Sequence, residues 1–317
     1  MNGDHMASGH LVVDKKVLTL ILIVLLLCLT TVISNGFIIV ALGTEWLQRR
    51  TLSPYNKLLV SLGASRFCLQ WVMIGKSTYF FLYPMVFLYD PVMQFLSLLW
   101  DFLNTATIWC CTGLSFFYCV KIANFTHPVF LWLKGKVSRW VPWILLSSVG
   151  FSGFTTILFF TGNHVLYQHY LRDKCQYWNA TGDSMRSFEN SYFFFLKISV
   201  FSIPFGIFLV FIVILLISLG RHMKKTLLTL SGFQDAPVQA HVRALLSIIF
   251  FALLFTSSFL VLILNNGSRF PLHEAKSWVW NIVSHLCMAV HSLFLLLNNP
   301  KLRATVERSC SPRCEVS

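Results

Sequence analysis

The sequence is poor in charged residues, and especially in acidic ones. Lys, Arg, Asp and Glu make up 12% of the 317 residues, and only 12 residues are Asp or Glu, whereas 56% are hydrophobic. Soluble domains usually carry about 25% charged residues. The length alone would suggest about two soluble domains. The low charge and a mean hydropathy of +0.68 exclude that reading and favour a bundle of membrane helices.

The residue combinations of an active site are also missing. We find no paired carboxylates, no cluster of metal ligands and no nucleophile with a base that would assemble in one layer of the chain. His285 and His291 come nearest to a metal site, but no neighbouring residue supplies the further ligands. The last apolar segment has no central lysine for a retinal Schiff base, since Lys276 lies at its outer edge. We therefore predict no enzyme activity, no metal and no cofactor.

What the sequence does contain is seven apolar stretches, each long enough to cross a bilayer. At a rise of about 1.5 Å per residue, a helix of about 20 residues spans the hydrocarbon. The stretches are Val17–Leu42, Leu58–Tyr83, Val92–Val120, Val141–Thr161, Tyr192–Leu219, Ala244–Leu264 and Trp278–Leu297. The predicted fold is all-α, a seven-helix transmembrane bundle that forms one domain over residues 1–317. The first stretch is too long for the core of a cleavable signal peptide, so we interpret it as a signal anchor.

The basic residues predict the orientation of the bundle. Fifteen Lys and Arg residues lie in the tail and in the loops after the first, third and fifth stretches, against seven on the other side. Because cytoplasmic loops are enriched in Lys and Arg, we expect an outer N-terminus and a cytoplasmic C-terminus in the plasma membrane. Lys15 and Lys16 oppose this orientation locally. Sorted in this way, the net charge of +13 does not indicate a nucleic-acid partner.

Few of the nine cysteines are placed to form a disulfide. Cys175 is the only cysteine in a predicted outer loop, and most others lie in apolar stretches, where we interpret them as small hydrophobic residues. Cys310 and Cys314 in the tail are either palmitoylation sites or free thiols.

The third stretch ends at a basic edge in the string FYCVKIANFTHPVFLWLK, Phe117 to Lys134. This string resembles the third-helix signature of the bitter taste receptors, the type 2 taste receptor family, which reads FYxxKIANFxHPxFLWLK. The resemblance runs from the first stretch to the seventh. It is greatest to the branch whose members begin MNGDHM, as Met1 to Met6 do here.

The resemblance implies a G-protein-coupled receptor for bitter small molecules that signals through a gustducin-like G protein of the Gi class and lies among membrane lipids. The residues alone leave a multispanning channel or transporter as the alternative. Neither an internal repeat nor a pair of broken helices in corresponding halves supports that alternative.

One arginine lies deep in the second stretch. Arg66 would cost roughly 2.5–3.5 kcal/mol at the bilayer centre, so it should face the bundle and be paired. The candidate partners are Asn35, Ser61, Ser292 and backbone carbonyls. The resemblance places Asn35, Arg66 and Ser292 in an inner polar network and implies that Arg66 holds the resting and active packings apart.

A stripe on the third stretch carries an aromatic and several polar groups into the bundle, since Trp100, Asn104, Cys111 and Ser115 recur at helical spacing. On composition alone, Trp100 could equally be an interfacial anchor. The resemblance aligns Trp100 and Asn104 with positions that line the family's bitterant pocket. It aligns Asn281 with a further ligand-facing position that often carries a carboxylate.

Two other residues complete the predicted ligand-binding set. Asp101 lies beside the stripe and is either a counter-ion for cationic bitter compounds or a partner of Lys76. Ser77 follows Lys76 in the outer part of the second stretch, where Lys76 itself could simply extend to the membrane surface.

The inner side carries the residues expected to meet a G protein. A basic rim by itself indicates only orientation, but the third inner loop resembles that of the family. The residues assigned to this side are Tyr118, Lys121, His222, Lys224, Lys225 and His241.

Two prolines and one phenylalanine have predicted conformational roles. Pro142 lies near the start of the fourth stretch, where the first helical turn tolerates it. Pro204, in a string resembling the family's SxPF, should bend the fifth helix. Phe255 stands where many family members have a tyrosine, so it is a switch candidate that lacks the hydroxyl.

Asn179 in the second outer loop is the predicted glycosylation site, in the sequon Asn-Ala-Thr. The sequon at Asn124 lies on the predicted cytoplasmic side and should stay unmodified, and that at Asn266 lies too close to the bilayer.

Overall fold

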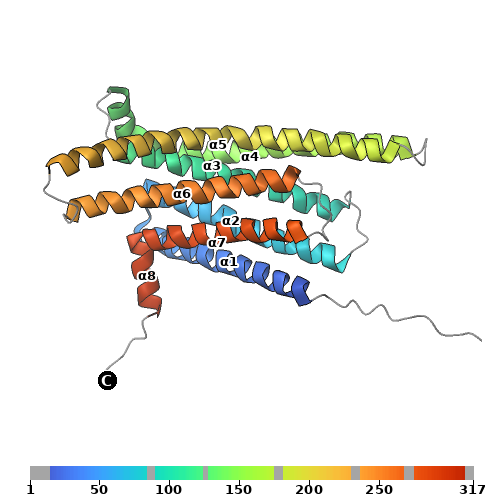
Figure 1. The fold of residues 1–317 in the computed structure, drawn as a ribbon, viewed down its shortest axis with the longest axis horizontal. Helices are drawn as coiled ribbons and strands as arrows, with labels where there is room; N and C mark the ends of the chain where they lie inside the picture. Colours follow the sequence, from blue (N-terminus) through green and yellow to red (C-terminus); the bar gives the residue numbers. More distant parts are fainter. Residues whose placement is uncertain are drawn as a thin grey trace, which may run out of the picture.

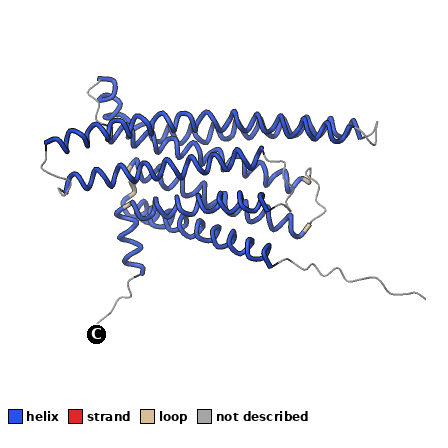
Figure 2. Tube along the Cα trace, in the orientation of Figure 1, coloured by secondary structure: helices blue, strands red, loops and turns tan. Residues whose placement is uncertain are grey.

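The computed structural model describes residues 15–83, 90–123, 128–174, 181–229, 236–267 and 275–310. These residues form eight helices and no strand (Figures 1 and 2). The helices are α1 (Lys15–Arg49), α2 (Pro54–Leu82), α3 (Pro91–Ile122), α4 (Pro128–Lys174), α5 (Thr181–Thr229), α6 (Ala236–Gly267), α7 (Ala275–Asn298) and α8 (Pro300–Cys310).

Each predicted apolar stretch lies within one of the first seven helices, apart from Tyr83, which caps the end of α2. The helices extend beyond the stretches because polar residues cap their ends. The Asp90 carboxylate accepts hydrogen bonds from the backbone N–H groups of Val92 and Met93, at 2.9 and 3.2 Å, directly before Pro91. Ser53 caps α2 in the same way, and both helices begin with a proline, which needs no N–H partner.

The distribution of side chains is that of a membrane protein. Large apolar residues are exposed along the outer faces, among them Leu26 and Ile33 on α1 and Phe154 and Ile157 on α4. Polar groups such as Asn35 and Arg66 are buried inside. Among the described helices, α1 to α5 are each long and apolar enough to span a bilayer, and α6 contains the shorter apolar segment Ile248–Val261.

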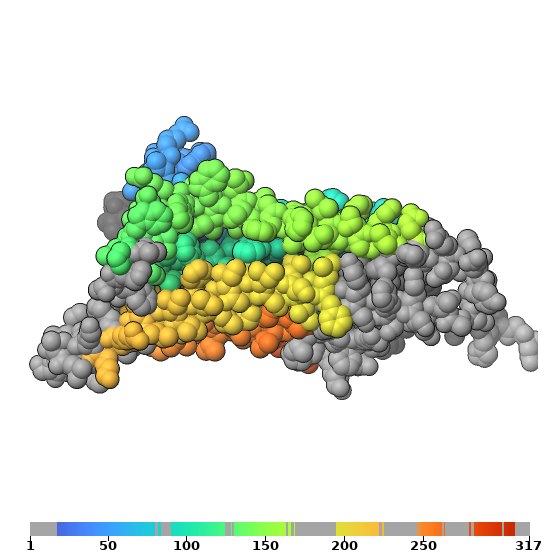
Figure 3. Space-filling model, turned by 90° about the horizontal axis from the view of Figure 1, so that it is seen from above, coloured from blue at the N-terminus to red at the C-terminus, as the bar shows by residue number. Residues whose placement is uncertain are grey.

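The helices lie side by side along the long axis of the bundle (Figure 1), and the contacts of α1, α2, α4, α5, α6 and α7 close into a ring. Helix α1 contacts α2 and α7, α5 contacts α6, and α6 contacts α7. Helix α3 contacts α2, α4 and α5, and it is visible between α4 and α5 in Figure 3. This central position explains why most of α3 from Asn104 to Val120 is buried.

A close approach of helices near the middle of α3 depends on Gly113. A Cβ atom at this position would lie 2.8 Å from Cγ2 of Ile144 on α4 and 3.6 Å from Cδ2 of Leu58 on α2. Small residues allow membrane helices to pack closely, so Gly113 lets α4 lie against α3.

The structure departs from two expectations. Pro142 does not lie in the first turn of a helix, because α4 begins at Pro128 and Pro142 is inside it. Helix α8 was not predicted. Its first turn is capped by Asn299, whose Oδ1 accepts from the N–H groups of Lys301 and Leu302 at 3.1 and 3.4 Å. It leaves α7 at an angle of 94°, and Figure 1 shows it turned away from the direction of α7.

Candidate functional site

Polar and aromatic side chains gather in the outer half of α3, where we define the outer cluster as Lys76, Ser97, Trp100, Asp101, Asn104 and Lys197. Ser97, Asp101 and Asn104 follow one another at helical spacing, so they share a face of α3, with Trp100 beside Asp101. Lys76 comes from α2 and Lys197 from α5. The stripe predicted on α3 therefore faces inward, and its neighbours on two other helices are basic.

Asp101 is paired within the protein. Its Oδ1 lies 3.2 Å from Nζ of Lys197, and the side chains are 8% and 20% exposed. The Lys197 Nζ also lies 5.3 Å from the ring centre of Trp100 and 5.7 Å from that of Phe159, within the range of cation–π attraction. Of the two sequence-based expectations for Asp101, the partner Lys76 lies near enough to attract its charge, but the direct ion pair is with Lys197.

Lys76 does not extend to the membrane surface. Its Nζ donates to Ser97 Oγ on α3 at 3.0 Å. Asn104 is 5% exposed, and its Nδ2 has no hydrogen-bond partner among the described residues. Ser77, also predicted to bind ligand, is exposed, and no described contact joins it to the outer cluster. The side chain of Asn281, on α7, lies outside the described residues.

Arg66 is buried at the level of the bundle centre and is bound to α7. Its Nη2 lies 2.8 Å from Nδ1 of His291, and the same nitrogen lies 3.6 Å from Sγ of Cys111 on α3. Because a guanidinium only donates, His291 must accept through Nδ1 and carry its proton on Nε2. Nε and Nη1 of Arg66 and Nε2 of His291 have no partner among the described residues.

These contacts correct the predicted partners of Arg66, which were Asn35, Ser61 and Ser292. Asn35 Nδ2 instead donates to Ser292 Oγ at 2.9 Å and to the backbone O of Thr31 at 2.8 Å. The network therefore has two parts that meet α7 at adjacent residues, with α2 bound at His291 and α1 bound at Ser292. From the sequence, His291 stands out only as a weak metal-ligand candidate, and its position beside Ser292 is the signal that could place it in this network.

Phe255, the switch candidate, is buried in a group of phenylalanines between α5 and α6. Its ring centre lies 4.3 Å from that of Phe208 and 6.0 Å from that of Phe205. Phe205 stacks on Phe259 at 3.8 Å with 7° between the ring planes. Ring packing, rather than a hydrogen bond of a hydroxyl group, holds the Phe255 side chain in place.

The phenylalanine group connects the proline of α5 to the Arg66 site. The backbone O of Pro204 lies 2.9 Å from Oγ1 of Thr112 on α3, next to Phe205. At the other end, Phe251 contacts the ring of His291 edge-on at 4.9 Å. A series of described contacts thus connects Pro204 of α5, through the phenylalanines of α6, to His291, which binds Arg66.

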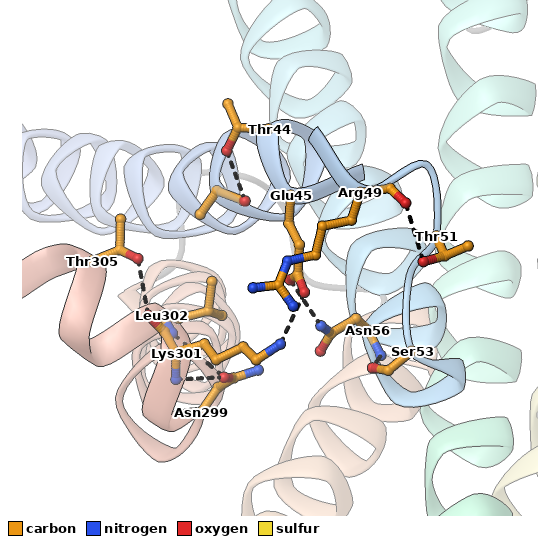
Figure 4. Close-up of polar contacts among 11 residues, drawn as sticks. Thr44, Glu45, Arg49, Thr51, Ser53, Asn56, Asn299, Lys301, Leu302 and Thr305 are labelled. Atoms are coloured by element: carbon orange, nitrogen blue, oxygen red, sulfur yellow. Dashed lines mark hydrogen bonds and ion pairs between the residues drawn. The ribbon is translucent and has the colours of Figure 1, made fainter. Parts of the chain in front are cut away.

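A third polar group lies at the inner end of the bundle, where Glu45, Asn56 and Lys301 form what we call the inner clasp (Figure 4). The two carboxylate oxygens of Glu45 accept from Lys301 Nζ at 2.9 Å and from Asn56 Nδ2 at 3.3 Å. Since these residues belong to α1, α2 and α8, one carboxylate joins three helices. Sequence reasoning missed Glu45. Acidic residues are scarce on the predicted cytoplasmic side, and this scarcity was the signal that could have identified Glu45.

Glu45→Gln is expected to loosen α8 with little effect on global stability. Lys301 is 61% exposed, and an ion pair with such a partner contributes about 0–1 kcal/mol. Hydrogen–deuterium exchange of the purified protein should become faster within α8. Glu307→Gln is the matched control, because its bond with Arg303 lies entirely within α8. Equal effects of the two substitutions would contradict a docking role for Glu45.

The other residues assigned to the inner side are only partly described. Tyr118 packs against Tyr55 of α2 with ring centres 5.7 Å apart. Lys121 and Lys224 are exposed, and Lys121 Nζ lies 3.5 Å from the backbone O of Lys134. The side chains of His222, Lys225 and His241, and the sequons at Asn124 and Asn179, lie outside the described residues.

An all-helical bundle with an apolar exterior and a buried polar network defines a multi-pass membrane protein. The chain matches the family model described as taste receptor protein (TAS2R) over residues 12–311. It is 56% identical to taste receptor type 2 member 60 of Homo sapiens over 315 residues, 99% of each chain. It is 54% identical to taste receptor type 2 member 135 of Rattus norvegicus over 307 residues, 96% of each chain.

The chain therefore belongs to the type 2 taste receptor family. It is a G-protein-coupled bitter taste receptor and not an enzyme. The fold class and the family resemblance predicted from the sequence are confirmed.

Proposed function

We propose that bitter compounds bind in the outer cluster, with Trp100 and Asn104 of α3 as one wall and Asn281 of α7 as another. The observation that carries this proposal is the Asn104 amide, which is buried and whose Nδ2 lacks a partner in the part of the chain that the structure describes. Buried donors are normally satisfied, so a hydrogen-bond acceptor is expected there. Trp100, one turn away, offers the aromatic surface on which such a compound would lie.

Ligand binding would reach the inner side through the helices that the outer cluster connects. Lys197 lies on α5 seven residues before Pro204, and the phenylalanine group links α5 to α6 and to His291. A ligand that shifts α5 would therefore change the packing around Phe255 and the Arg66–His291 bond. A rearranged inner rim, with Tyr118, Lys121, His222, Lys224, Lys225 and His241, would then bind a gustducin-like G protein of the Gi class.

The same proposal includes one domain over residues 1–317, an extracellular N-terminus and a cytoplasmic C-terminus in the plasma membrane. The exposed apolar faces of α1, α4 and α5 support contact with lipids. The excess of basic residues near the inner ends supports the orientation.

The test is expression of the chain with a promiscuous Gα chimera and calcium recording against a panel of bitter compounds. Responses should appear at matched surface expression and disappear without the chimera. The class of G protein is then tested by substituting Gα subunits of the Gi class for the chimera. Ionic currents or uptake that persist without any G protein would contradict the proposed mechanism.

Asn179→Gln is expected to remove one glycosidase-sensitive shift on a denaturing gel, because Asn179 lies in a loop that we place on the lumenal side. Asn124→Gln is the control and should change nothing. A glycan on Asn124 instead would mean that the orientation is inverted.

A further inference from the structure

The charges of the outer cluster do not balance. Of its three charged side chains, Asp101 pairs with Lys197 at 3.2 Å. Asp90, the carboxylate directly before α3, caps the helix and accepts from Tyr79 Oη at 3.0 Å as well as from two backbone N–H groups. Lys76 has one described hydrogen bond, to the neutral Ser97 hydroxyl. Two ammonium groups therefore share one carboxylate, and Lys76 has no direct ion pair among the described residues.

The cluster offers free hydrogen-bond donors, whereas the acceptor oxygen of its one carboxylate, Asp101 Oδ1, already faces Lys197 Nζ at 3.2 Å. An ammonium group carries three N–H donors, and Lys76 uses one of them on Ser97. Because Ser97 accepts this bond, its own proton is available to a further acceptor. The Asn104 amide adds a buried donor without a described partner.

We propose that the outer cluster selects aromatic acids, with the carboxylate or sulfonate of the ligand bound by Lys76 and Ser97. This inference rests on the proposed binding of bitter compounds in the outer cluster. Ser97 and Asn104 are seven residues apart, about 10 Å along α3. A suitable ligand places its acid group at Lys76, its ring beside Trp100 and a neutral acceptor at Asn104.

The same geometry disfavours cationic ligands. Asp101, the one buried carboxylate of the cluster, already has Lys197 as its counter-ion, and the Lys197 Nζ is the cation nearest the Trp100 ring in the described structure. A ligand ammonium would have to displace Lys197 and remain near Lys76. Removing Lys197 should reverse this preference by exposing the Asp101 carboxylate.

The experiment uses compound triplets that share one aromatic body and differ only in bearing a carboxylate, a primary amide or an ammonium group. Effective concentrations are measured by calcium recording with the Gα chimera at matched surface expression. In the unmodified receptor the acid should be at least about tenfold more potent than the amide, a difference of about 1.4 kcal/mol, and the amine should be weakest.

Three substitutions separate charge from packing. Lys76→Met should remove the advantage of the acid over the amide, Lys76→Arg should retain it, and Lys197→Met should raise the potency of the amine. Thr78→Ala, an exposed neighbour on α2, is the control and should change none of the three.

Equal potency of acid and amide in the unmodified receptor would overturn this inference while leaving the binding site in place. An equal loss of potency for acid and amide in Lys76→Met would also overturn it, because that result indicates a structural role. If no bitter compound gives a G-protein-dependent response, the proposed binding function fails, and the inference fails with it.

Discussion

Replacing His291 by alanine is expected to disturb the receptor about as strongly as replacing Arg66 itself. Arg66 is buried, and its described polar partners are His291 Nδ1 at 2.8 Å and Cys111 Sγ at 3.6 Å. Without His291, the guanidinium retains among the described residues only the weak sulfur acceptor of Cys111. A hydrogen bond to a charged group contributes about 1.5–3 kcal/mol, and a buried charge left unpaired is costlier still. Surface expression should fall several-fold or basal signalling should change, for all agonists alike.

A double-mutant cycle of Arg66 and His291 tests whether the two residues stabilise the protein through their mutual bond or independently of each other. Thermal unfolding of the purified single and double variants should give a coupling of at least about 1 kcal/mol, because the second substitution removes nothing further from the pair. His291→Asn keeps a side-chain acceptor and should recover part of the loss. Ser292→Ala is the control at the next residue and breaks only the neutral bond to Asn35. Additive losses, or a changed response to a single agonist with normal expression, would contradict the proposed role.

The positions of the helices were predictable because hydrophobic length is a local property of the sequence. Each apolar stretch corresponds to one helix, and the spacing from Ser97 to Asn104 identifies the inward face of α3. The same local signals missed the true extent of α4, since the basic residues before Val141 look like a loop although the helix continues through them from Pro128.

The partners of buried polar residues were less predictable because they depend on the rotation of each helix about its axis. His291 and Ser292 are adjacent in sequence, yet they point about 100° apart around α7, and the structure gives Arg66 the first and Asn35 the second. For Asp101, the sequence suggested Lys76 as the nearby cation. Which lysine reaches it depends on the rotation and depth of α5, from which Lys197 comes.

The phenylalanine group gives a physical route between the outer cluster and the Arg66 site, although contact alone is not evidence of coupling. Its members form an unbroken set of ring contacts from Phe205 beside Pro204 to Phe251 at His291. Phe255 therefore joins α5 to α6 through ring contacts, without a hydroxyl.

Trp100→Ala is expected to raise the effective concentration of agonists at least about tenfold, or about 1.4 kcal/mol, at matched surface expression. The Trp100 ring lies 5.3 Å from Lys197 Nζ and one turn from Asn104, so a ligand in the outer cluster would lie against it. A buried aromatic anchor commonly contributes a few kcal/mol to binding. An interfacial anchor would instead affect folding and delivery to the surface. Dose–response curves corrected for surface expression distinguish the two roles.

Trp109 on the same helix provides a matched control, because it stacks on Phe151 of α4 at 5.0 Å rather than facing the outer cluster. Trp109→Ala should lower surface expression without changing potency.

Asn104→Ala removes the buried donor and should alter agonist selectivity, with the smallest effect on compounds that lack hydrogen-bond acceptors. If Trp100→Ala and Asn104→Ala both reach the surface and keep unchanged curves for several unrelated agonists, the ligand binds elsewhere. The unpaired amide of Asn104 would then be a packing feature of α3 and not part of a binding site.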